Sequence, residues 1–286
     1  MSSGSLPEIE FSPQSQMRSP LRLFSSMLRD GWNARGLAWR LAVRDISAKY
    51  RQAWLGLFWA FLPPLATTLM FIILRGGNVL DAGDTGEVPY AVFVMWGSVY
   101  WMLFRDALAM PVTVVNGAKS MLTKLQFPRE AILLSGALQV LFNFVITLAL
   151  GIAVLLWYQV SLPWTIVLVP VAVLAILLFG FLIGTLLVPV GLLYTDIQQS
   201  LNFLVMMWMF LTPIGYGVAQ DGALATIMSW NPMTPLLTIA RDWTLTGDMA
   251  ALEGLFWVGG GSLVCMFIAW MLFRVAMPIV IERAGA

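Results

Sequence analysis

The chain has 286 residues, of which 59% are hydrophobic and 11% are charged, and its formal net charge is +1. A soluble domain carries charge on about a quarter of its residues, so this composition indicates an integral membrane protein. The long apolar runs are continuous rather than alternating, which favours α-helices over a β-barrel. The near-neutral balance offers no general attraction for nucleic acid.

The residue types that are missing exclude most catalytic chemistry. The chain has no histidine, which is the usual general base and the commonest metal ligand, and its single cysteine, Cys265, rules out a disulfide framework or a zinc cluster. A glycine-rich phosphate-binding loop is also absent from the sequence. We therefore expect a protein that is not an enzyme and has no metal site. A membrane-embedded acyl- or glycosyltransferase is the rival class, and the lack of clustered acid and base residues argues against it.

Residues 1–35 are polar and charged and lack the apolar core of a cleavable signal peptide, so we expect a cytoplasmic tail there. Residues 36–53 follow as a predicted amphipathic helix at the membrane surface. Asp45 and Lys49 on this helix are spaced to form an ion pair. A simple membrane anchor and a docking surface for a cytoplasmic partner both fit the pattern. The helix carries an apolar stripe of Trp39, Val43, Ile46 and Tyr50 beside a basic stripe of Arg40, Arg44 and Arg51.

Six apolar segments follow, each near the length of about 20 residues that a membrane-spanning helix needs. Together they predict a transmembrane domain over residues 54–277, with a cytoplasmic tail over 278–286. Thirteen of the sixteen Lys and Arg residues flank one side of these segments, so the positive-inside rule places both termini in the cytoplasm. Gly180 and Gly184 have the spacing of a close helix contact, and a chance arrangement explains them equally well. The predicted spans cover residues 54–75, 89–113, 131–158, 163–190, 197–215 and 254–277.

The connection from Thr212 to Gly247 is too apolar for a solvated loop and too often broken by proline and glycine for a span. Its short apolar pieces, Ala223–Met228 and Pro235–Ala240, predict re-entrant or interfacial half-helices. Such pieces are tolerated at membrane depth where they are buried in protein or line a cavity. The predicted fold is therefore an all-α integral membrane protein with six transmembrane helices, an N-terminal amphipathic interfacial helix and half-helices between spans five and six.

Spans two and five carry residues that suit a path for a substrate. Trp96, Tyr100 and Phe104 recur every four residues, and flat aromatic faces of this kind stack on sugars. Arg105 and Asp106 follow directly, and charges inside a membrane usually face the bundle interior or water. Ordinary helix packing and a salt bridge between helices are the alternatives for these two groups. The predicted path consists of Trp96, Tyr100, Trp101, Phe104, Arg105, Asp106, Trp208, Phe210 and Tyr216.

The segment from Asn116 to Glu130 mixes basic and apolar side chains before Pro128 opens the next helix. It fits either a positively charged loop or a short helix that docks in a partner's groove. Together with the predicted surface helix it gives a set of candidate docking residues. This set is Arg40, Arg44, Asp45, Lys49, Tyr50, Arg51, Lys119, Lys124, Phe127, Arg129 and Glu130.

Several short motifs, in order along the chain, resemble those of ABC-2 type permeases that export polysaccharides. The similarity extends from about Arg40 to Arg274, and it departs from the family at Pro63-Pro64 and after Pro213-Ile214. The motifs are Arg44-Asp45 with Lys49-Tyr50-Arg51-Gln52 and Trp59-Ala60, the run from Leu125 to Glu130, Leu193-Tyr194 with Asp196-Ile197, and Thr212-Pro213-Ile214 with Asn231-Pro232-Met233-Thr234.

The resemblance implies the transmembrane permease subunit of an ATP-driven exporter in the bacterial cytoplasmic membrane. Its substrate would be a lipid-linked polysaccharide such as O-antigen, capsule or teichoic acid, and export of a drug or lipid is the alternative. Two copies of the permease would assemble with two separate ATPase subunits that bind ATP and Mg, so no cofactor is expected in this chain. The predicted surface helix and the 116–130 segment would contact the ATPase, and the half-helices after Pro213 would shape the outer gate.

Overall fold

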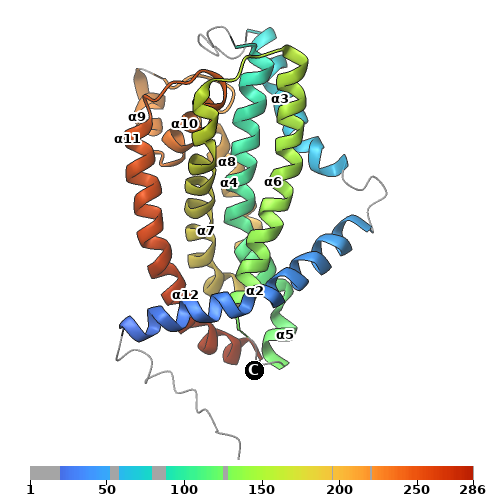
Figure 1. Ribbon diagram of the computed structural model, residues 1–286, viewed down its shortest axis with the longest axis vertical. Helices are drawn as coiled ribbons and strands as arrows, with labels where there is room; N and C mark the ends of the chain where they lie inside the picture. Colours follow the sequence, from blue (N-terminus) through green and yellow to red (C-terminus); the bar gives the residue numbers. More distant parts are fainter. Residues whose placement is uncertain are drawn as a thin grey trace, which may run out of the picture.

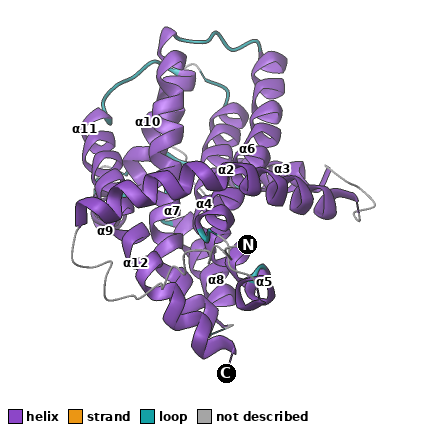
Figure 2. Ribbon diagram, turned by 60° about the horizontal axis from the view of Figure 1, so that its bottom comes forward, coloured by secondary structure: helices purple, strands orange, loops and turns teal. Residues whose placement is uncertain are grey.

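The computed structural model describes residues 20–51, 58–78, 88–124, 128–194, 196–219 and 221–285, and it gives side chains in these ranges except for 20–28, 123–124, 279 and 281–285. These residues form helices and connecting loops without any strand, as predicted (Figure 2). Within the described ranges, four helical stretches are long and apolar enough to cross a membrane: Phe58–Gly76, Glu130–Tyr158, Trp164–Leu193 and Leu252–Pro278.

The centre of the molecule is a row of four long helices that lie side by side in the order α6, α4, α7 and α12 (Figure 1). Helix α4 contacts both α6 and α7, and α12 contacts the far side of α7. Helix α3 packs on α4 and α6, and the shorter α8 packs on α4 and α7. The bounds are α3 Phe58–Gly76, α4 Tyr90–Gly117, α6 Glu130–Tyr158, α7 Val169–Leu193, α8 Asp196–Phe210 and α12 Gly261–Gly285.

Short helical pieces complete the row. The turn η1 leads into α7, and α11 continues through the π-helical η2 into α12. The six-residue α5 connects α4 to the segment before α6. The bounds are α5 Lys119–Lys124, η1 Trp164–Leu168, α11 Leu252–Leu255 and η2 Phe256–Gly260.

Two predicted spans are not among the four long apolar helices. Helix α8 has 15 residues, which is about 22 Å at 1.5 Å per residue, and it ends before Pro213, which lacks the amide hydrogen that a helix interior needs. Helix α4 has 28 residues, but the Arg105-Asp106 pair and its Trp and Tyr residues lower its mean hydropathy. Length and hydropathy alone therefore leave the count of six spans as a prediction.

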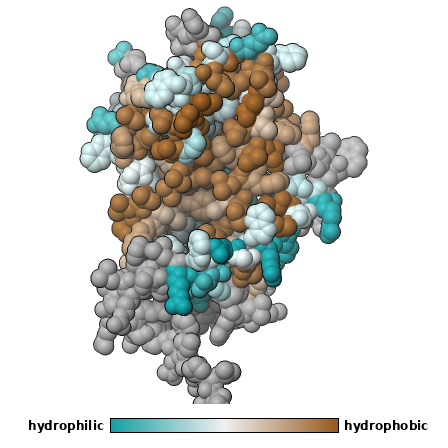
Figure 3. All heavy atoms as spheres, viewed as in Figure 1, coloured by the Kyte–Doolittle hydropathy of each residue, from teal (hydrophilic) through white to brown (hydrophobic). Residues whose placement is uncertain are grey.

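A broad apolar band covers the face of the molecule shown in Figure 3, with hydrophilic side chains gathered near its two ends. Apolar side chains are also exposed on three of the long helices, with Val145 on α6, Leu174 on α7 and Leu263 on α12 each more than half exposed. A surface of this kind matches the hydrocarbon interior of a bilayer. The chain is therefore a multi-pass membrane protein.

Helix α2, Pro20–Arg51, crosses one end of the row obliquely (Figure 1). It includes the predicted helix over residues 36–51 and begins earlier, at Pro20, while residues 52 and 53 lie outside the described ranges. Its inner face is formed mostly by small side chains, with Ala34, Ala38 and Ala42 each only 1% exposed and Leu41 beside them 7% exposed. Small residues let a helix backbone approach its neighbours closely. We call this end of the molecule the α2 end.

The bulky side of α2 faces outward. Trp39 and Val43, two members of the predicted apolar stripe, are 62% and 44% exposed. The helix therefore has two apolar faces, one that packs on the bundle and one that is free to contact lipid. The sequence pattern had indicated only the bulky one.

The opposite end of the molecule carries two short helices where half-helices were predicted. They are α9, Gly222–Trp230, and α10, Met233–Leu245. Helix α10 is largely buried and packs against α4, α7 and η1. Whether either helix enters the membrane stays a prediction. We call this end the α9 end.

Helices α4 and α7 meet at a close contact formed by two glycines. A Cβ atom on Gly180 would lie 2.7 Å from the Cβ of Ala107, and one on Gly184 would lie 2.8 Å from Pro111 Cγ. Both distances are shorter than van der Waals contact. The Gly-x-x-x-Gly spacing therefore marks a real helix contact rather than a chance arrangement.

Candidate functional site

An open cleft with a volume of ≈ 130 Å³ lies where α2, α3, α4 and α6 meet. It brings together residues that the sequence had assigned to two different roles. Lys49 and Tyr50 come from the predicted docking set, and Arg105 and Asp106 come from the predicted substrate path. The polar and charged residues that line the cleft are Lys49, Tyr50, Arg105, Asp106, Asn143 and Thr147.

A chain of hydrogen bonds joins three helices across this cleft. Arg105 donates from Nε and Nη2 to Asp106 Oδ1, at 3.1 and 2.9 Å. Asn143 Nδ2 on α6 donates to the other carboxylate oxygen of Asp106, at 3.2 Å. Tyr50 on α2 donates its hydroxyl to Asn143 Oδ1, at 3.2 Å. The last turn of α2 is therefore connected to α4 through one side chain of α6.

The surroundings of the cleft keep the Tyr50 hydroxyl, the first donor of this chain of hydrogen bonds, protonated. Burial raises the pKa of the Tyr50 hydroxyl, and the nearby Asp106 charge acts in the same direction. Tyr50 therefore stays protonated at neutral pH and can donate to Asn143. Two cations, Lys49 and Arg105, share the cleft with the single carboxylate of Asp106, so its ionised side chains carry an excess of one positive charge.

Sequence reasoning missed Asn143, although a signal was present. Ser135, Gln139, Asn143 and Thr147 recur every four residues in an otherwise apolar helix, and that spacing places them on one helix face. Gln139 Nε2 also reaches α2, where it donates to Asp45 Oδ2 at 3.4 Å. A polar stripe on a membrane helix is a stronger pointer to a site than any one of these residues alone.

The predicted docking residues are split between exposed and buried positions. Arg40, Arg44, Lys49, Arg51 and Lys119 are exposed. The predicted pair of Asp45 with Lys49 is replaced, because Asp45 instead accepts from its neighbour Arg44 at 2.8 Å. Phe127 and the side chain of Lys124 lie outside the described residues.

A second ionic group ties the α2 end together. Arg274 on α12 pairs with Asp30 on α2 and, through Nε at 3.5 Å, with Glu130 Oε1 at the start of α6. Glu130 is 6% exposed, and Arg129 beside it is partly buried. Glu130 therefore takes part in a bond that holds three helices together.

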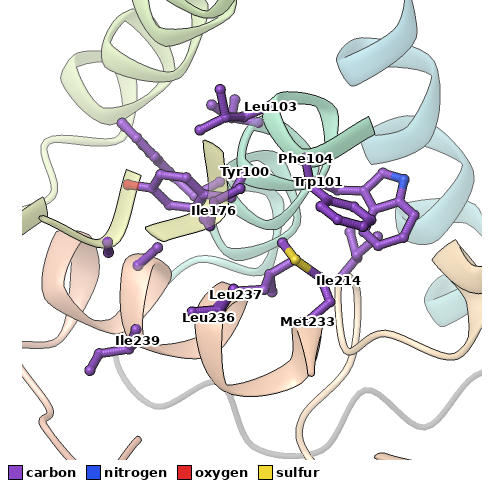
Figure 4. Packing of buried hydrophobic residues seen from close by; sticks show 14 of the residues in the cluster. Tyr100, Trp101, Leu103, Phe104, Ile176, Ile214, Met233, Leu236, Leu237 and Ile239 are labelled. Atoms are coloured by element: carbon purple, nitrogen blue, oxygen red, sulfur yellow. The ribbon is translucent and has the colours of Figure 1, made fainter. Parts of the chain in front are cut away.

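The aromatic stripe of α4 lies inside the protein. Trp96, Tyr100, Trp101 and Phe104 are at most 3% exposed and belong to the hydrophobic core that α4 forms with α7 and α10 (Figure 4). Phe104 stacks on Phe179, with ring centres 5.5 Å apart. Contact with a glycan would require α4 to separate from these neighbours, so the assignment of the four residues to a substrate path stays a prediction.

The other predicted path residues surround the end of α8. Trp208 is half-buried and donates from Nε1 to Asn231 Oδ1 at 2.9 Å. Phe210 is 41% exposed, and Tyr216 is buried with its hydroxyl on the Phe210 carbonyl at 2.5 Å. These three residues therefore do not share one open surface in this structure.

Buried polar side chains hold the chain in place where α8 ends. Arg241 on α10 is 3% exposed and donates from Nη1 to the Pro213 carbonyl at 2.8 Å. Asn231 Nδ2 donates to the Leu211 carbonyl at 3.1 Å and to Thr212 Oγ1 at 2.9 Å. Leu211 and Pro213 follow the last residue of α8 and lie outside any helix, and these two side chains supply partners for their carbonyls. Sequence reasoning had assigned no role to Arg241.

Among the described residues, no three His, Cys, Asp or Glu side chains gather closely enough to hold a metal ion. No family model matches the chain.

The chain is similar to curated transport proteins of bacteria. It is 27% identical over 251 residues to the O-antigen export system permease protein RfbA of Myxococcus xanthus, covering 87% of this chain and 95% of the relative. It is 22% identical over 210 residues to RfbA of Klebsiella pneumoniae, covering 71% and 78%. It is 20% identical over 245 residues to the polysialic acid transport protein KpsM of Escherichia coli, covering 82% and 91%. These similarities confirm the resemblance to polysaccharide-export permeases.

Proposed function

We propose that the chain is the permease subunit of an ATP-driven ABC exporter that moves a lipid-linked polysaccharide, of the O-antigen kind, across the bacterial cytoplasmic membrane. The observation that carries this proposal is the similarity over 87% of the chain and 95% of the M. xanthus O-antigen export permease. A match of that extent includes both ends of the bundle. KpsM, whose name refers to polysialic acid, adds that polysaccharide to the candidate cargoes.

The proposed topology has six spans with both termini in the cytoplasm. Helices α4 and α8 supply spans two and five, and the central position of α4 between α6 and α7 supports this assignment (Figure 1). A helix enclosed by other helices can carry Arg105 and Asp106 through a bilayer, because neither side chain has to face lipid. The α2 end is then cytoplasmic, as the distribution of Lys and Arg predicts.

The proposed work of export comes from a partner. Two copies of the chain assemble with two ATPase subunits, which bind ATP and Mg and carry out the hydrolysis. These subunits contact the exposed residues of α2 and the 116–130 segment. The hydrogen-bond chain from Tyr50 through Asn143 to Asp106 offers a direct route by which a movement of α2 reaches α4. Arg274 offers a second route, from α2 to α12 and α6.

Depletion of the chain in its native bacterium tests this function. We expect the surface polysaccharide to disappear and a lipid-linked glycan to accumulate on the cytoplasmic face, measured by mass spectrometry of extracted lipids. Accumulation of a drug or an ordinary lipid, with surface glycan unchanged, would instead support the alternative cargo. As a control, expression of the chain from a plasmid should restore the surface polysaccharide.

A further inference from the structure

We propose that the cleft between α2, α3, α4 and α6 binds the phosphate that joins the carrier lipid to the first sugar of the exported glycan. This inference rests on the proposed function, and it gives the cleft a specific ligand chemistry. The groups involved are the cations Lys49 and Arg105, the amide of Asn143, and the aromatic side chains of Tyr50 and Trp59.

The charges in the cleft favour an additional anion. Both carboxylate oxygens of Asp106 already accept hydrogen bonds, one from Arg105 and one from Asn143. A guanidinium has five N–H donors, and two donate to Asp106, so others are left for a ligand. The side chain of Arg105 is 42% exposed, and its planar fork suits phosphate oxygens. Lys49 supplies the second positive charge and is also exposed.

The cleft is open, and its charged groups gather at one place. Lys49 on α2 and Arg105 on α4 both line its volume of ≈ 130 Å³. Two cations at one place suit a single anionic group, whereas a run of neutral sugars has no use for them. The cleft is therefore suited to recognition of the lipid-linked end of the glycan.

The aromatic residues at the cleft provide a place for the sugar. Trp59 at the start of α3 is 54% exposed, so its face is accessible, and an indole face stacks on the apolar side of a sugar ring. A carboxylate such as Asp106 also accepts from sugar hydroxyls when it reorients. A phosphate with an attached sugar uses every group described here, whereas a bare phosphate leaves Trp59 without a role.

The position of the cleft fits delivery from the membrane. Helix α2 has the outward Trp39 and Val43 of an interfacial helix, which lies at the level of the lipid headgroups. Tyr50, in the last turn of α2, contacts the cleft directly. The phosphate of a carrier lipid therefore has to move inward from the headgroup level along the end of α2 to reach Arg105, which lies near the middle of α4, and the lipid does not leave the membrane on this path.

Binding measurements on the full chain in phosphatidylcholine nanodiscs test the proposal. The three probes are farnesyl phosphate glucose, farnesyl phosphate and the neutral farnesyl glucoside. We expect farnesyl phosphate glucose to bind at least about tenfold more tightly than the glucoside, because charged hydrogen bonds contribute about 1.5–3 kcal/mol. Trp59→Ala should weaken binding of farnesyl phosphate glucose and leave that of farnesyl phosphate unchanged.

The variants separate charge recognition from folding. Lys49→Gln should weaken both phosphate probes about tenfold without changing the binding of the glucoside, and Arg105→Gln should do the same if the protein still folds. Arg35→Gln is the matched control, since Arg35 is an exposed cation on the same helix and lies about 21 Å from Lys49 along it. Equal binding of all three probes, or an equal effect of Arg35→Gln and Lys49→Gln, would overturn the proposal.

A further arm distinguishes the carrier from ordinary lipid. Nanodiscs that contain phosphatidylglycerol should still bind farnesyl phosphate glucose, and complete competition by phosphatidylglycerol would show a general headgroup site and reject the proposal. The cleft and the exporter function fail independently. If binding depends on the charged residues but depletion of the chain causes no glycan to accumulate, the phosphate site is supported and glycan export is rejected. If depletion causes the glycan to accumulate but binding does not depend on these residues, glycan export is supported and the phosphate site is rejected.

Discussion

Helix α4 has two sides that differ in almost every physical respect. Phe104 is 0% exposed and lies among rings from α7 and α8, while the side chain of its neighbour Arg105 is 42% exposed in the cleft. The closed side is held by dense packing and glycine contacts, and the open side by hydrogen bonds between side chains. Of two adjacent residues on one helix, one can therefore stabilise the fold by packing in the core while the other stays accessible and can bind a ligand.

The largest expected effect is that of Phe104→Ala, which probes the closed side. Replacing a fully buried ring by a methyl group costs about 3–5 kcal/mol, so we expect a large drop in the melting temperature of the purified protein in detergent. Phe203→Ala is the control, because Phe203 is 62% exposed and should change the melting temperature little. Loss of export with an unchanged melting temperature would show that Phe104 contacts the substrate. It would contradict the assignment of this side of α4 to stability alone.

A smaller effect is expected where α4 and α7 touch. In Gly184→Ala the new methyl group would overlap Pro111 and the backbone of α4, and such overpacking costs about 1–3 kcal/mol. The same change at Gly261 meets no atom within 4 Å and serves as the control. Thermal unfolding of both variants measures the difference, and equal melting temperatures would mean that the two helices do not pack this closely.

The smallest stability effect is expected on the open side. Tyr50→Phe removes one hydrogen bond to Asn143, worth about 0.5–1.5 kcal/mol. We nevertheless expect weaker coupling, seen as ATP hydrolysis by the partner that continues while glycan export falls. Tyr194→Phe, at a tyrosine that is 63% exposed, is the control. Unchanged export per ATP in Tyr50→Phe would remove the proposed route from α2 to α4.

The sequence predicted the parts of this fold that depend on local pattern. Apolar runs located α6, α7 and α12, and the short apolar pieces Ala223–Met228 and Pro235–Ala240 located the short helices of the α9 end. The four-residue spacing of Trp96, Tyr100 and Phe104 correctly gave one face of α4. Which neighbour covers that face could not be read from the same pattern, because α7 and α10 come from later in the chain.

The candidate site was predicted only in pieces for a similar reason. Tyr50 and Asp106 were both identified, but in separate roles, since only the fold brings them to one cleft. Asn143, which joins them, was overlooked even though the polar spacing of α6 was visible. The inner face of α2 was missed because alanines such as Ala34 and Ala38 give a weak hydrophobic signal, whereas Trp39 gives a strong one.

The pairing of Asp30 with Arg274 has a consequence for how the protein is made. The two residues are 244 positions apart, so the first helix emerges from the ribosome long before its partner on α12 has been synthesised. During that interval Asp30 has no Arg274 with which to pair, so the front half of α2 lacks its ionic attachment to α12. Truncated chains that stop before the last helix should therefore expose this segment to added protease, and biogenesis is complete only when the final span has been inserted.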